Sequence, residues 1–180
     1  MAKVAIFCSS SLEVSSMFLA EAEDVGRDLA IAGHTIVYGG ANCGMMGRVA
    51  QAALKAGGKV IGIIPDLDFA KGLNQPGLTH EVVVHNLAER KALMLQEADM
   101  AVALPGGIGT LDEVFEALVM KCTGQWPKPI YFHNFLDFWT PVIEALTLIA
   151  EQRMITQPLH ELYEVCLNRK ELLTHLQRGN

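Results

Sequence analysis

The stretch DMAVALPGGIGTLDE, residues 99–113, decides the fold, because an apolar run ends there in proline and glycine and a segment with helical spacing follows. The same order recurs along the chain in the runs VAIFCSS (4–10), HTIVYGG (34–40), KVIGIIP (59–65) and PIYFHN (129–134). A further strand or edge extension is EVVVH (81–85), and a last strand is LYEVC (162–166). Such alternation is typical of a parallel sheet packed between helices. We therefore predict an α/β fold with a mostly parallel sheet flanked by helices on both faces.

Length and composition favour one globular unit, so residues 1–180 are expected to form a single domain. Hydrophobic residues make up 51% of the chain, and the net charge of −6 is carried by scattered rather than clustered charges. This balance argues against nucleic acid or an anionic membrane as a partner. The four cysteines are far apart, and the histidines show no metal-binding spacing. The first apolar run is too short for a signal peptide, so we expect a cytoplasmic protein without a bound metal.

Helix starts are marked by capping boxes, in which a polar side chain caps the helix and an acid three residues later reaches back. Four pairs fit this pattern: Ser10 with Glu13, Asn86 with Glu89, Thr110 with Glu113, and Asn168 with Glu171. The pattern gives Glu113 a purely structural explanation.

Two glycine loops are expected at one rim of the sheet. GGANCGMMG (39–47) follows the strand that ends at Tyr38, and PGGIGT (105–110) follows the strand that ends at Leu104. Ligands of parallel sheets bind beyond the carboxyl ends of the strands, where glycine turns expose backbone N–H groups and the helix dipole favours anions. PGGIGT is therefore a candidate phosphate cradle, although glycines also serve tight turns. Neither loop matches the P-loop or the dinucleotide fingerprint.

The segment NLAERKALMLQEAD (86–99) places Arg90 and Lys91 on or beside an otherwise apolar helix face. Both lie in the early turns, where the helix dipole disfavours positive charge. We therefore expect a ligand phosphate or a carboxylate nearby. The alternative is that both side chains extend to water and an acid such as Glu89 neutralises them.

Glu113 has two interpretations. The apolar stripe of its helix is predicted at positions 111, 114, 115, 118, 119 and 122, so Glu113 points away from the stripe. It either caps the helix or faces the ligand cleft, where a carboxylate could bind a sugar hydroxyl or a water and stabilise an oxocarbenium ion. Asp112 competes for this role, although a solvated charge is the simpler interpretation. The aperiodic segment 66–79 is expected to be a loop beside the site.

The sequence resembles the LOG proteins, often labelled "lysine decarboxylase-like". PGGIGTLDE matches their P-G-G-x-G-T-x-x-E motif, and GGANCGMMG and ERK fit their spacing. The resemblance implies a Rossmann-like fold, a homodimer, and cleavage of AMP or an N6-modified, cytokinin-type AMP to free base and ribose 5-phosphate. No recognisable pyridoxal-phosphate lysine supports the decarboxylase label, and no cofactor is expected.

The resemblance assigns Arg90 and Glu113 as the catalytic pair, with Arg90 positioning the nucleotide and Glu113 working at the ribose. The expected substrate-binding residues are Ser9, Gly40, Gly44, Met46, Lys91, Pro105, Gly106, Gly107, Ile108, Gly109 and Thr110.

The chain departs from the family pattern at three places, of which the second lies near the base-binding side, so the resemblance leaves the base preference open. CSSS (8–11) replaces Cys-Gly-Ser-Ser, VMKCTGQWPKP (119–129) differs from the usual Trp and Gln region, and residues 71–79 lack an acid found in plant members. A non-catalytic carrier or sensor of a nucleotide or molybdopterin-type cofactor is the alternative function. A dinucleotide oxidoreductase is disfavoured because the first turn lacks its fingerprint.

Overall fold

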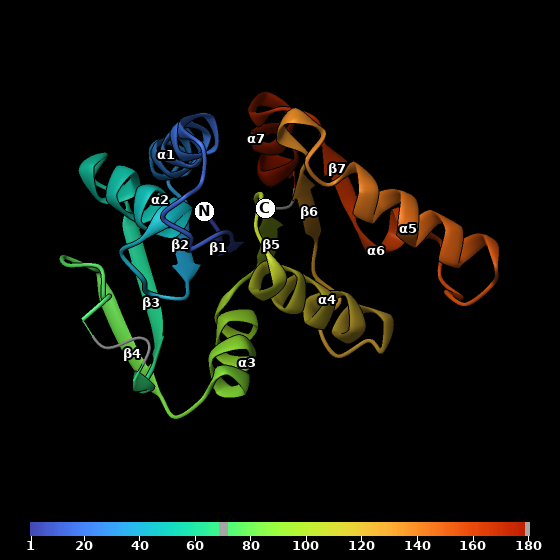
Figure 1. The fold of residues 1–180 in the computed structure, drawn as a ribbon, viewed down its shortest axis with the longest axis horizontal. Helices are drawn as coiled ribbons and strands as arrows, with labels where there is room; N and C mark the ends of the chain where they lie inside the picture. The colour runs from blue at the N-terminus through green and yellow to red at the C-terminus, as the bar shows by residue number, and fades with distance from the viewer. Residues whose placement is uncertain (69–71, 179–180) are drawn as a thin grey trace.

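The computed structural model describes residues 1–68 and 72–178, and within these it forms one sheet with helices on both sides (Figure 1). The strand order is β4-β3-β2-β1-β5-β6-β7, and every neighbouring pair is parallel. The strands are β1 Lys3–Phe7, β2 Thr35–Tyr38, β3 Lys59–Pro65, β4 His80–Val84, β5 Met100–Ala103, β6 Ile130–His133 and β7 Glu164–Cys166. The predicted α/β class is confirmed, and the two weaker runs form the edge strands β4 and β7.

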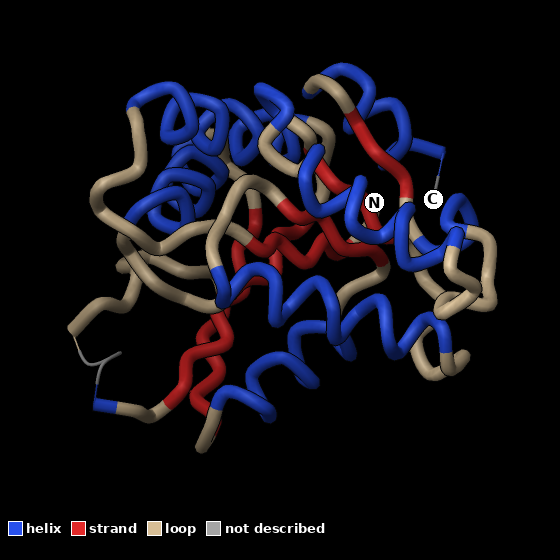
Figure 2. The backbone as a smooth tube through the Cα atoms, turned by 45° about the vertical axis from the view of Figure 1, so that its right-hand side comes forward, coloured by secondary structure: helices blue, strands red, loops and turns tan. Residues whose placement is uncertain are grey.

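Seven α-helices and one 3-10 turn are described: α1 Ser16–Ile31, α2 Gly44–Lys55, α3 Leu87–Glu97, α4 Ile108–Cys122, η2 Phe135–Asp137, α5 Thr140–Glu151, α6 Leu159–Leu162 and α7 Arg169–Arg178. Figure 2 shows helices above and below the sheet. In the described part of the chain, no helix is long and apolar enough to cross a membrane.

The core has two layers because strand side chains alternate between the two faces of the sheet. In β1, Val4 and Ile6 pack with residues of α1, α2 and α7, whereas Ala5 and Phe7 pack with residues of α3, α4 and α5. All four β1 side chains are at most 1% exposed. Burial on both faces explains why the strand sequences are continuous apolar runs rather than alternating patterns.

Two of the four predicted capping boxes are confirmed. At α3, Asn86 Oδ1 accepts a hydrogen bond of 2.8 Å from the N–H of Glu89, and Glu89 Oε2 accepts one of 2.8 Å from the N–H of His85. At α7, Asn168 Oδ1 accepts from the N–H of Glu171 at 3.0 Å. These caps fix where α3 and α7 begin.

The other two capping boxes are wrong. Ser10 and Glu13 lie in the loop before α1, which begins at Ser16, and the N–H of Glu13 donates to Ser11 Oγ instead. Thr110 lies inside α4, whose N-cap is Gly107. The helix begins earlier than the sequence pattern indicated because extended backbone at Gly107 already turns the chain into α4.

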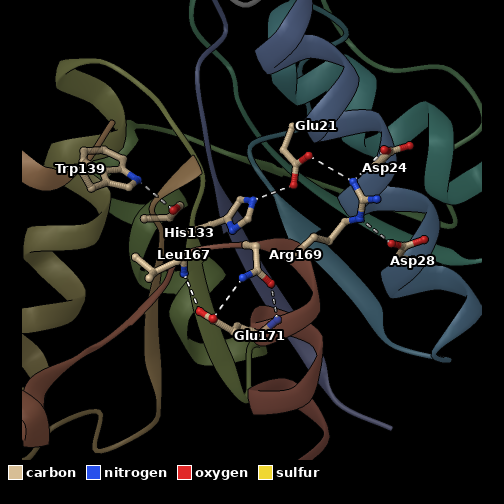
Figure 3. Close-up of polar contacts among 10 residues, drawn as sticks. Glu21, Asp24, Asp28, His133, Trp139, Leu167, Arg169 and Glu171 are labelled. Carbon is tan, nitrogen blue, oxygen red and sulfur yellow. Dashed lines mark hydrogen bonds and ion pairs between the residues drawn. The ribbon is translucent and has the colours of Figure 1, made fainter. Parts of the chain in front are cut away.

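Helix α7 is tied to α1 by the polar network in Figure 3. Arg169 donates to Glu21 Oε2 at 3.1 Å and to Asp24 Oδ2 at 2.7 Å, and it pairs with Asp28 Oδ2 at 2.8 Å. Glu21 also bonds the fully buried His133, at the end of β6, at 2.8 Å. The network therefore joins α1, near the start of the chain, to β6 and α7, in its last third.

Candidate active site

The two glycine loops meet at one rim of the sheet, as predicted, and Ser9 joins them. The N–H of Ser9 donates to the carbonyl of Pro105 at 3.2 Å, and the carbonyl of Ser9 accepts from the N–H groups of Met45 and Met46 at 2.9 and 3.2 Å. These contacts use the backbone of Ser9, while its hydroxyl accepts from the N–H of Ser11. Ser9 therefore fixes the spacing of the loops through its main chain.

The N-terminus of α4 forms an open cradle. Gly107, Ile108 and Gly109 are exposed, and the first N–H groups of a helix have no acceptor within the helix. Thr110 is only 3% exposed and its side chain packs on Gly106, where a Cβ atom would lie 2.1 Å from Thr110 Oγ1. The combination of bare backbone, a hydroxyl and the positive end of the helix dipole suits an anion such as a phosphate.

Replacing Gly106 with alanine is expected to weaken binding of inorganic phosphate more than replacing Gly109 does. The methyl group at position 106 meets Thr110 Oγ1 and Cβ at 2.1 and 2.6 Å, so the loop or Thr110 must move, whereas a Cβ at Gly109 meets nothing within 4 Å. Isothermal titration calorimetry with both variants measures the difference. Equal affinities would show that the position of Thr110 does not matter for the cradle.

Arg90 and Glu113 form a buried ion pair between α3 and α4. Arg90 Nη2 donates to Glu113 Oε1 at 2.6 Å, and the two side chains are 16% and 8% exposed. Burial raises the pKa of Glu113 to about 7, against the opposing effect of the Arg90 charge. The capping role for Glu113 is therefore wrong, and the side chain instead lies under the rim with a pKa near neutral pH.

Helix α4 is rotated relative to the predicted apolar stripe. Val114 and Leu118 are buried as expected, but Phe115 is 37% exposed and Val119 is 61% exposed. The buried face includes Glu113, because Arg90 on α3 compensates its charge. A hydrophobicity pattern cannot place a carboxylate inside when its partner comes from another helix.

Lys91 lies one position beyond Arg90 and binds carboxylates of α4. Its Nζ donates to Asp112 Oδ1 at 2.8 Å and lies 2.6 Å from Glu116 Oε2. Burial lowers the pKa of Lys91, but the hydrogen bonds to both carboxylates outweigh this and raise it. The prediction that anions lie beside Arg90 and Lys91 is thus confirmed, and these anions are carboxylates of α4. Lys91 joins α3 to α4, and its predicted contact with phosphate stays a prediction.

A pocket of about 100 Å³ adjoins Arg90 on the side of the second glycine loop. Predicted residues Gly40 and Met46 line it, together with Ser10, Gly39, Ala41, Cys43, Ile64, Pro65, Leu73 and Asn74. Gly44 does not line this pocket. A Cβ on Gly44 would lie 2.5 Å from the carbonyl of Ser11, so this glycine serves close packing of the loops.

Residues 73–75, which were expected only as part of a loop, lie against the second glycine loop, and Leu73 and Asn74 line the pocket. The N–H of Asn42 donates to the carbonyl of Leu73 at 2.6 Å, and the N–H of Gln75 donates to the carbonyl of Gly40 at 2.9 Å. Ala41 and Asn74 form an antiparallel bridge between these bonds. We call residues 73–75 the strap. Residues 69–71 of the predicted loop lie outside the described residues.

The described side chains include no group of three or more His, Cys, Asp or Glu that could hold a metal ion. The chemical groups that the rim does bring together are a guanidinium, a carboxylate and the free N–H groups of a helix end. This set can bind an anion and can move a proton near neutral pH.

Comparisons with known proteins identify relatives of this chain. A family model described as "possible lysine decarboxylase" matches residues 46–176. A protein of Rhodococcoides fascians named cytokinin riboside 5′-monophosphate phosphoribohydrolase is 37% identical over 164 residues, which cover 91% of this chain and 83% of that protein. The phosphoribohydrolase LOG5 of Arabidopsis thaliana is 31% identical over 97% of this chain and 77% of its own length.

Solved structures share the fold. The molybdenum cofactor carrier protein of Chlamydomonas reinhardtii superposes with a TM-score of 0.77 at 19% identity, covering 99% of this chain and 98% of that one. The molybdenum cofactor binding protein of Rippkaea orientalis gives a TM-score of 0.71 at 19% identity, covering 98% and 95%. At this identity the likeness concerns the fold alone.

Proposed function

Because the chain belongs to the LOG family, we propose that it is a hydrolase that cleaves the N-glycosidic bond of a nucleoside 5′-monophosphate. The substrate is AMP or an N6-modified AMP, and the products are the free base and ribose 5-phosphate. The observation that carries the proposal is the buried Arg90–Glu113 pair beside the open N-terminus of α4. Two relatives that span most of this chain are named for this reaction.

The sugar phosphate is anchored at the cradle. Exposed N–H groups at Gly107, Ile108 and Gly109, with the helix dipole, bind the 5′-phosphate, and the hydroxyl of Thr110 stands beside them. The phosphate is remote from the bond that breaks, so its binding energy can hold the ribose in the geometry of the transition state.

Glu113 and Arg90 act at the ribose. The C1′–N bond breaks with its electron pair going to the base, and a water oxygen forms the new bond to C1′. The carboxylate of Glu113 stabilises the oxocarbenium-like transition state and accepts a proton from the water. A pKa of about 7 makes the carboxylate available at neutral pH and lets it return the proton to the departing base. Arg90 orients the carboxylate through its 2.6 Å bond and positions the nucleotide.

The test is to incubate the purified protein with AMP and, separately, with N6-isopentenyl-AMP, and to measure free base and ribose 5-phosphate by chromatography. Release of both products in equal amounts is expected, together with a much slower release in Arg90→Ala. Nucleotide binding without release would contradict the proposal and favour the non-catalytic carrier or sensor.

We also propose that the protein is a homodimer in a cytoplasmic setting. Helix α4 exposes an apolar stripe in which Ile108 is 82%, Phe115 37% and Val119 61% exposed, with Leu111 on the same side. The stripe begins at the cradle, so a second copy that covers it would also lie beside the substrate. Contiguous exposed apolar side chains of this kind are typical of interfaces.

Val119→Glu is expected to shift the protein from dimer to monomer, because the new charge would be buried at the interface without a partner. The fold should survive, since Val119 is mostly exposed in the single chain. Light scattering after size exclusion measures the mass. The matched control is Val83→Glu on β4, which has the same 61% exposure and lies outside the stripe. A dimer that persists in Val119→Glu would place the interface elsewhere.

A further inference from the structure

The pocket is lined by Arg90, one member of the proposed catalytic pair. Arg90 Nη2 binds Glu113, while Arg90 Nη1 lies 2.9 Å from the position of a Cβ atom on Gly39, in the floor of the pocket. The guanidinium therefore has the carboxylate on one side and the pocket on the other. A nucleotide whose ribose lies at Glu113 places its base within reach of this pocket, provided that the proposed function holds.

The residues that line the pocket suit a flat, apolar ring, and we call this pocket the slot. Gly39 and Gly40 leave its floor without side chains, and a Cβ on Gly40 would lie 2.2 Å from Ile64 Cγ1. Apolar walls come from Met46, Ile64, Pro65 and Leu73. Bare backbone between apolar side chains lets a heteroaromatic ring approach closely.

Of the side chains that the structure describes, one buried polar atom without a hydrogen-bond partner belongs to a residue that lines the slot, Arg90. Among the described residues, five buried side-chain polar atoms lack a hydrogen-bond partner, and three of them are Tyr38 Oη, Gln75 Oε1 and Arg90 Nε. Arg90 lines the slot, Tyr38 directly precedes its glycine floor, and Gln75 directly follows Asn74 in the strap. A buried polar atom without a partner is costly, and a ligand in the slot with a hydrogen-bond acceptor would satisfy Arg90 Nε.

A second pocket near the cradle does not fit the base as well. It is lined by Ser9, Val14, Ser15, Phe18, Met45, Pro105, Gly106, Gly107 and Phe138, and these described residues include no charged side chain. It does not include Arg90 or Glu113, so a base bound there would lie away from the catalytic pair.

Leu73 is the wall of the slot that can be changed without changing the fold. The strap is held by backbone bonds from Asn42 to Leu73 and from Gln75 to Gly40, which no side-chain substitution at position 73 removes. The Leu73 side chain is 44% exposed, so it closes the slot toward solvent rather than packing in the core.

We propose that this slot is the base subsite and that Leu73 limits the size of the N6 substituent on the purine. Pockets for whole drug-sized ligands measure about 300 to 1,000 Å³, whereas this slot measures about 100 Å³. A bare purine edge fits such a slot, and a branched five-carbon substituent meets Leu73.

The test compares kcat/KM for AMP and for N6-isopentenyl-AMP in the wild type, Leu73→Ala and Leu73→Phe. Leu73→Ala is expected to raise the ratio of isopentenyl-AMP to AMP by about tenfold or more, the usual effect of a few methylene groups in an apolar pocket. Leu73→Phe is expected to lower the ratio. The control Val83→Ala removes a similarly exposed apolar side chain on β4, outside the slot, and should leave the ratio unchanged.

An unchanged ratio in both Leu73 variants, with hydrolysis of AMP retained, would overturn the size limit but not the proposed reaction. Absence of hydrolysis in the wild type would overturn the reaction. In that case the ratio of dissociation constants of the same two nucleotides, measured by calorimetry in the wild type and Leu73→Ala, still decides the assignment of the slot. A tenfold shift supports it, and equal ratios reject it.

Discussion

Glu113→Gln should lower kcat by about 10² to 10⁴-fold and change KM little, because general base catalysis contributes a factor of this size to the transition state alone. Glutamine keeps the shape of the side chain and can still accept the bond from Arg90 Nη2, so the pair of helices stays in place. It cannot accept a proton or stabilise positive charge at C1′. Steady-state kinetics with AMP at pH 8 gives both constants.

The matched control is Glu144→Gln, which makes the same substitution at an exposed position on α5. It should leave both kinetic constants unchanged. Wild-type kcat in Glu113→Gln would remove Glu113 from the mechanism and leave it a structural role.

Glu113→Gln should also change how the free energy of unfolding depends on pH. The pKa of Glu113 is about 7 in the folded protein and near its ordinary 4.5 in the unfolded chain, so the folded state binds the extra proton between these values. The contribution of Glu113 to the free energy of unfolding is therefore full below about pH 4.5 and is lost as the pH rises through about 7. Urea denaturation at several pH values should show this loss in the wild type and a smaller one in Glu113→Gln.

Arg90→Met should shift the pH dependence of kcat upward as well as reduce activity at neutral pH. The positive charge of Arg90 lowers the pKa of Glu113, and an opposite charge at this range shifts a carboxyl group by about 1 to 3 units. Without it the carboxylate forms only at higher pH, so the rising limb of the kcat profile moves by that amount. The limb moves to higher pH because catalysis needs the charged carboxylate of Glu113. In Arg90→Met, burial raises the pKa of Glu113 and no guanidinium opposes it.

A kcat profile between pH 5 and 10 measures the shift. Arg48→Met is the control, since Arg48 on α2 is half exposed and pairs with Glu23 away from Glu113. A reduced kcat with an unmoved rising limb would contradict the prediction. It would show that Arg90 positions the nucleotide and does not set the pKa of Glu113.

Much of the rim could be predicted from sequence because it depends on local signals. Glycines after apolar runs mark the ends of parallel strands, and Asn86 with Glu89 marks the start of α3 correctly. Once α3 begins at Leu87, Arg90 falls in its first turn, close to the rim. The conflict between its charge and its apolar helix face correctly indicated a nearby anion.

The orientation of α4 could not be predicted in the same way. Thr110 and Glu113 fit a capping box, but Gly107 starts the helix earlier and Glu113 faces Arg90. Which face of α4 is buried depends on a cation supplied by α3, 23 residues earlier in the chain. The position of the strap could not be predicted either. Its hydrogen bonds to the second glycine loop join backbone groups, so they do not depend on the side-chain pattern of the sequence.

The tie between α1 and α7 has a consequence for how the chain folds. Glu21 bonds to His133, 112 positions later, and to Arg169, 148 positions later. On the ribosome, α1 is synthesised long before either partner, so its acidic edge stays hydrated until nearly the whole chain has emerged. Because β1 also needs β5 before the central strands are complete, contacts of long sequence separation dominate. We expect slow folding that finishes only after translation. The face of β1 and β2 that α3 and α4 later cover is meanwhile the natural place for a chaperone to bind.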